Sequence, residues 1–140
     1  QSSQMEIIAR HGYPAEAHKV VTEDGYILTM HRMPHGRTNC SRGGRPVLLL
    51  HGLTSSSFEF LSQTPNKSLS YSLADEGYDV WIGNNRGNIY SMAHRKFDNT
   101  DSRFWNFSWD EMATYDTPAM VDYILNITNH TDLYFVGYSQ

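Results

Sequence analysis

The residues with the clearest chemical potential are Gly137-Tyr138-Ser139-Gln140, which follow a short apolar run at residues 133–136. One more glycine would complete the pattern G-x-S-x-G, in which a serine stands on a sharp turn between a strand and a helix. The pattern predicts Ser139 as a nucleophile and the backbone N–H of Gln140 as one donor to an oxyanion. Taken alone, the four residues fit an ordinary turn after a strand equally well.

A second apolar run, residues 47–50, leads into His51-Gly52-Leu53. Short apolar runs bounded by glycine are typical of strands that are covered on both faces of a parallel sheet. Gly52 would let the backbone approach a ligand closely, so the N–H of Leu53 is predicted as the second oxyanion donor. His51 is expected to shape this loop rather than to transfer protons. Together the two motifs are far more specific than either one.

The elements that must position these motifs begin with a hairpin. Residues 18–22 and 26–30 read as two strands, and Asp24-Gly25 supplies the positive φ that a tight turn requires. Further strands are predicted at 47–51, 78–83 and 133–136, with a helix over 68–76 that ends at Gly77. A second helix follows residue 108; Pro118 should interrupt it, and Asp116 is expected to cap its continuation. This alternation predicts an α/β fold with parallel strands.

Composition narrows the class of protein and its compartment. The net charge of −4 argues against a nucleic-acid partner, and no apolar run reaches the roughly 18 residues that a membrane span requires. Five Asn-x-Ser/Thr sequons are dense for 140 residues and point to the secretory route, with the protein secreted or lysosomal. The candidate N-glycosylation sites are Asn39, Asn66, Asn106, Asn126 and Asn129.

Several longer motifs together resemble the animal acid lipase family, the group of lysosomal acid lipase and gastric lipase. They include His11-Gly12-Tyr13-Pro14, Thr22-Glu23-Asp24-Gly25-Tyr26, His51-Gly52-Leu53, Gly83-Asn84 with Arg86-Gly87-Asn88, and Phe104-Trp105. The resemblance extends from about Glu6 to Gln140. It implies an incomplete α/β-hydrolase fold, the N-terminal part of a mostly parallel sheet up to the nucleophile elbow. Residues 1–45 would form an N-terminal lipase-associated region with the hairpin, and 46–140 the first part of the core, truncated after the nucleophile.

The resemblance also implies a chemistry. A serine esterase or lipase of this kind hydrolyses triacylglycerols or cholesteryl esters at a lipid–water interface through an acyl-enzyme, with no metal and no cofactor. The triad acid and histidine follow the serine along such chains. None of the seven histidines follows Ser139, so no catalytic base is assigned and residues 1–140 alone are expected to be inactive.

Two other interpretations stay open. A naturally short, non-catalytic form could bind lipid or a partner protein without turnover. Alternatively, the substrate could be a soluble ester or an epoxide, although an epoxide hydrolase would normally carry aspartate at the elbow, so Ser139 favours acyl transfer.

Overall fold

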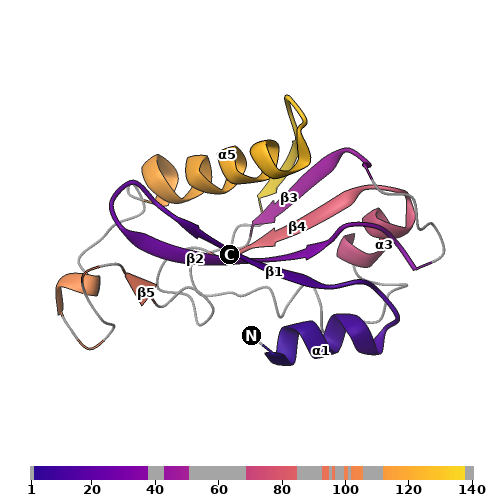
Figure 1. Cartoon of the computed structure of the whole chain (residues 1–140), viewed down its shortest axis with the longest axis horizontal. Coiled ribbons are helices and arrows are strands. Elements are labelled where there is room, and N and C mark those ends of the chain that lie inside the picture. Colours follow the sequence, from indigo (N-terminus) through magenta and orange to yellow (C-terminus); the bar gives the residue numbers. More distant parts are fainter. Residues whose placement is uncertain are drawn as a thin grey trace.

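The computed structural model describes residues 2–37, 43–50, 69–84, 93–94, 96, 100, 102–105 and 112–137. Their strands form one six-stranded sheet in the order β1-β2-β4-β3-β6, with β5 paired to β2 (Figure 1). The strands are β1 (Glu16–Val21), β2 (Tyr26–Met33), β3 (Pro46–Leu50), β4 (Asp79–Gly83), β5 (Ala93–His94) and β6 (Tyr134–Gly137). The helices are α1 (Ser2–Arg10), α3 (Leu69–Asp75), a 3-10 turn (Ser102–Trp105), a π-helical turn (Met112–Asp116) and α5 (Thr117–Thr128).

The predicted hairpin is confirmed as β1 and β2. Gly25 has a φ of 98°, and the N–H of Thr22 donates to the carbonyl of Tyr26 at 2.8 Å, which closes the turn. β2 extends three residues beyond the predicted strand and pairs antiparallel with β4, with Met30 opposite Gly83. The hairpin is therefore continuous with the rest of the sheet.

The parallel part of the sheet consists of β4, β3 and β6. All five residues of β3 and all five of β4 are buried, which explains their continuous apolar sequence. Successive side chains of a strand point to opposite faces. Val47 and Leu49 accordingly pack with α1 and α3, whereas Leu48 and Leu50 pack with α5. Figure 1 shows the resulting three layers, with α5 on one side of the sheet and α1 and α3 on the other.

The predicted helix over 68–76 is confirmed as α3, and Gly77 ends it as expected. Gly77 has a φ of 101°, which a residue with a side chain rarely adopts. The N–H of Tyr78 donates to the carbonyl of Leu73, and the N–H of Gly77 to that of Ala74, each at 3.1 Å. These two bonds form a Schellman motif and satisfy carbonyls that the helix leaves unpaired.

Helix α1 and the role of Asp116 both differ from the sequence prediction. The helix α1 was not predicted. Its position depends on Ile8, which is buried in the core with Tyr71 of α3. Asp116 stands at the start of α5, but the prediction that it caps this helix is wrong. Its backbone is already helical (φ −70°, ψ −52°) and its side chain makes no cap hydrogen bond, whereas a capping residue needs an extended backbone.

Candidate active site

The three predicted site residues, Leu53, Ser139 and Gln140, lie outside the described residues. The structure instead describes the two strands that lead to them. β3 and β6 are neighbours and run parallel, with Leu48 opposite Phe135 and Leu50 opposite Gly137. Leu53 comes three residues after Leu50, and Ser139 two residues after Gly137. The carboxyl ends of the two strands therefore meet at one edge of the sheet, where ligands bind in open α/β sheets.

The end of β4 supports the same edge from the other side of β3. Leu50 is paired with Gly83, and the next residue, Asn84, is fully buried. The Asn84 side-chain amide donates to the carbonyl of Thr29 on β2 at 2.9 Å. This bond holds the carboxyl end of β4 to the neighbouring strand.

Helix α5 packs closely on this end of the sheet because Gly83 has no side chain. A Cβ at position 83 would lie 2.7 Å from Met120 Sδ and 3.2 Å from Leu50 Cδ1. α5 leads directly to β6 along the chain, so its position on the sheet helps to fix the strand that precedes Ser139.

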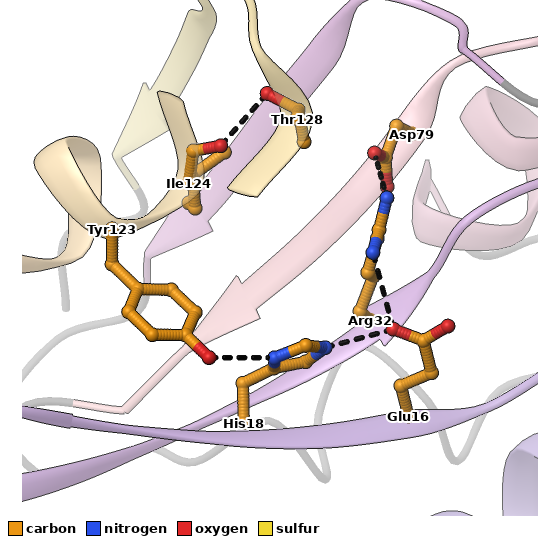
Figure 2. Close-up of polar contacts among 7 residues, drawn as sticks. All are labelled: Glu16, His18, Arg32, Asp79, Tyr123, Ile124 and Thr128. Atoms are coloured by element: carbon orange, nitrogen blue, oxygen red, sulfur yellow. Dashed lines mark hydrogen bonds and ion pairs between the residues drawn. The ribbon is translucent and has the colours of Figure 1, made fainter. Parts of the chain in front are cut away.

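A polar cluster that sequence analysis did not identify ties α5 to the sheet (Figure 2). His18 Nε2 lies 2.8 Å from Glu16 Oε1, and His18 Nδ1 lies 2.9 Å from the hydroxyl of Tyr123 on α5. Arg32 lies between the two carboxylates: it donates from Nε and Nη2 to Asp79 at 2.8 and 2.6 Å, and from Nη1 to Glu16 at 3.1 Å. Strands β1, β2 and β4 are thus linked to α5.

Electrostatics within this cluster favour the charged forms of Glu16 and Arg32. Burial by itself raises the pKa of Glu16, but the hydrogen bond from His18 and the charge of Arg32 outweigh it, so the pKa lies below its ordinary value. Burial likewise lowers the pKa of Arg32, while the ion pair with Asp79 more than offsets this and raises it. Asp79 is nearly fully buried, and the two bonds from Arg32 give a partner to each of its side-chain oxygens.

Of the predicted glycosylation sites, Asn126 and Asn129 are described and both are exposed. Asn126 is on α5, and Asn129 follows the helix in the left-handed conformation with a φ of 58°. Asn39, Asn66 and Asn106 lie outside the described residues.

The described part of the chain holds neither a metal site nor a membrane span. Its histidines, aspartates and glutamates form no group of three that could hold a metal ion. No helix there is long and apolar enough to cross a bilayer.

Comparison with known proteins agrees with this geometry. Residues 45–140 match the family model of the alpha/beta hydrolase fold, and residues 4–64 match that of a partial alpha/beta-hydrolase lipase region. The chain is 50% identical over 136 residues to human lipase member N and 48% identical over 137 residues to bovine gastric triacylglycerol lipase. It is also 51% identical over 134 residues to Lipase 1 of Drosophila melanogaster. These relatives confirm the resemblance to animal lipases.

Each of these matches covers 96% of this chain. The matched region is only 34% of the human and bovine proteins and 29% of the Drosophila protein. The chain therefore spans about a third of the length of these relatives. Among solved structures, an esterase of Pyrococcus furiosus superposes with a TM-score of 0.64 at 19% identity, over 93% of this chain and 41% of the esterase. Dipeptidyl peptidase 4 of Porphyromonas gingivalis superposes with a TM-score of 0.57 at 16% identity, over 91% and 17%. Both likenesses concern the fold.

Proposed function

Since the chain belongs to the alpha/beta hydrolase fold family, we propose that the protein is a serine lipase that hydrolyses triacylglycerols or cholesteryl esters. Ser139 is the nucleophile, and the backbone N–H groups of Leu53 and Gln140 form the oxyanion hole. The observation that carries the proposal is the parallel pairing of Leu50 with Gly137, because it brings the strands before both motifs to one edge. The identity of about half of the residues to named lipases supports the substrate class.

In this mechanism the Ser139 hydroxyl attacks the ester carbonyl and a histidine accepts its proton. The two N–H groups stabilise the tetrahedral oxyanion, and the alcohol leaves to give an acyl-enzyme that water then hydrolyses. The histidine and its acid partner come after the serine along the chain in this fold. We therefore assign them to a part of the protein that corresponds to the other two-thirds of the relatives.

Three of the described histidines make contacts that support the fold. His18 contacts Glu16 and Tyr123, and His35 Nδ1 lies 2.9 Å from the carbonyl of Gly36. His94 Nε2 lies 2.9 Å from the carbonyl of Asp24. Each of these three rings is held by contacts that support the hairpin or the loops.

The test uses the protein expressed from its complete coding sequence in eukaryotic cells. Emulsified triolein and cholesteryl oleate test for lipid esters, and dissolved p-nitrophenyl butyrate tests for soluble esters. Ser139→Ala should lower kcat at least about a thousandfold, since removal of a nucleophile leaves only the binding and oxyanion contributions. Ser72→Ala, on the exposed side of α3, is the matched control and should keep full activity.

A fluorophosphonate probe gives a second readout, because it should label the protein at Ser139 and fail to label Ser139→Ala. Full activity in Ser139→Ala would overturn the assignment of the nucleophile. Binding of lipid vesicles without hydrolysis of any of the three esters would instead favour the non-catalytic alternative. The secretory route, secreted or lysosomal, belongs to the same proposal and is supported by the sequons.

A further inference from the structure

A cleft of about 530 Å³ opens between the β1–β2 hairpin and α5, and the proposed reaction does not use it. Its hairpin side includes Val21 and Glu23, and its α5 side includes Asp122, Tyr123 and Asn126. The volume lies within the range of small-molecule sites, and the wall combines carboxylates, an aromatic ring and an aliphatic side chain. Val21 remains 41% exposed, which is a large exposure for an apolar strand residue.

Asn126 places a sequon at the rim of this cleft. The sequence Asn126-Ile127-Thr128 meets the acceptor pattern for N-glycosylation, and the Asn126 side chain is exposed. Residues three and four positions apart share one face of a helix. Tyr123 and Asp122 therefore lie beside Asn126 along the cleft, so a group attached to Asn126 Nδ2 begins next to both side chains.

The ring of Tyr123 is already fixed in position. Its hydroxyl lies 2.9 Å from His18 Nδ1 (Figure 2). Its ring meets the rings of His18 and Trp81 edge-on, at 5.6 and 6.1 Å between centroids. A side chain that is ordered beforehand loses little entropy when a ligand packs on it. A pyranose ring suits such a wall: its C–H groups pack on an aromatic ring, and its hydroxyls donate to carboxylates.

We propose that Asn126 carries an N-linked glycan whose first sugar, an N-acetylglucosamine, docks in this cleft and joins the hairpin to α5. The inference rests on the secretory route of the proposed function. Attachment forms the bond from Asn126 Nδ2 to the sugar C1 as the bond from C1 to a lipid-linked diphosphate breaks. The amide nitrogen loses one proton, and the diphosphate departs with the electron pair.

The folded structure indicates that the glycan is attached before helix α5 forms. The hydroxyl of Thr128, the third residue of the sequon, donates to the carbonyl of Ile124 at 2.7 Å within α5 (Figure 2). The enzyme that attaches the glycan needs an accessible sequon. Attachment at Asn126 therefore precedes the formation of α5. Asn129, the other described sequon residue, does not line the cleft, so it serves as the matched control site.

The experiment begins with the complete protein from eukaryotic cells that keep their glycans in the high-mannose form. Peptide mass mapping measures occupancy at Asn126. The glycans of one sample are then trimmed with an endoglycosidase that leaves a single N-acetylglucosamine. The glycans of another sample are removed completely with an amidase, which cleaves the bond between the asparagine side chain and the sugar. We expect the single-sugar form to keep the Tm of the intact protein and the stripped form to lose about 2–4 °C.

Variants separate docking from nonspecific effects of glycosylation. Asn126→Gln should show the Tm loss of the stripped form without the new carboxylate that the amidase creates, and Asn129→Gln should keep the parental Tm. In Tyr123→Leu, the Tm difference between trimmed and stripped forms should disappear. An unoccupied Asn126, or equal Tm values for the single-sugar and stripped forms, would overturn the proposal. None of these readouts measures hydrolysis, so failure here is distinguishable from failure of the lipase assignment.

Discussion

Leu50 of β3 and Gly137 of β6 are opposite one another in adjacent parallel strands, although most of the chain lies between them in sequence. This pairing is the structural basis for joining two separate motifs into one candidate site. The residues that precede Leu50 in β3 are buried, whereas those that precede Gly137 in β6 are exposed.

The first prediction concerns Gly36, which lies against the end of α3. A Cβ at this position would be 2.5 Å from the carbonyl oxygen of Ala74 and 2.7 Å from the Cα of Asp75. Both atoms belong to the backbone and cannot rotate away, so Gly36→Ala should lower the free energy of unfolding by about 1–3 kcal/mol. Urea denaturation measures this. Ser72→Ala, exposed on the same helix, should change stability by less than about 0.5 kcal/mol; an equally small effect of Gly36→Ala would contradict the packing described.

The second prediction concerns His31, which is fully buried on β2. Burial, aided by the charge of Lys19, lowers its pKa from 6.5 to about 4. The folded protein therefore resists taking up a proton that the unfolded chain accepts once the pH falls below 6.5. Stability should fall between pH 6.5 and 4, by up to about 3 kcal/mol from this group.

Urea denaturation at pH 7, 5.5 and 4.5 tests this dependence. His31→Gln should flatten the slope over this range, even if its stability at pH 7 is lower. His130→Gln, on the turn after α5, should leave the slope in place. An unchanged slope in His31→Gln would show that another group is responsible.

The third prediction concerns Glu16. Its pKa is lowered in the folded state by His18 and Arg32, which outweigh the effect of burial. A carboxylate with a lowered pKa contributes stability above its unfolded pKa, and the contribution disappears as the pH falls through the folded value. Glu16→Gln should therefore be less stable than the parent at pH 7, and the difference should shrink as the pH falls below the unfolded-chain pKa of about 4.3. Because the Glu16 side chain is 34% exposed, we expect less than about 1 kcal/mol; a difference that grows in acid would contradict the network.

The fourth prediction concerns β6, whose side chains Tyr134, Phe135 and Val136 are 53%, 50% and 37% exposed. An exposed apolar strand at the edge of a sheet offers unpaired backbone groups to other chains. Residues 1–140 expressed alone should therefore self-associate in sedimentation velocity. Phe135→Lys should shift the distribution toward monomer, whereas Ile127→Lys, on the exposed side of α5, should not. A monomeric parent chain would overturn the prediction.

Sequence reasoning succeeded where a feature depends on a few neighbouring residues. Asp24-Gly25 specifies a turn through the positive φ of its glycine, and Gly77 ends α3 for the same reason. The continuous apolar sequence of β3 and β4 follows from burial on both faces.

Sequence reasoning failed where the interacting residues come from distant parts of the chain. Glu16, Arg32 and Asp79 meet only after three strands have paired, and no local spacing indicates this. The roles of Ser139, Leu53 and Gln140 stay predictions, as does the division of the chain at residue 45.

The strand order of the sheet has a consequence for the protein during its synthesis. β3 is complete early, but its neighbour β6 emerges from the ribosome only after the intervening residues 51–133 have been made. At typical rates of translation this interval is on the order of ten seconds. During that time the apolar strand β3 has one edge without its final neighbour, and closing so long a loop is slow. The nascent chain is therefore expected to depend on chaperones more than a protein with mainly local contacts.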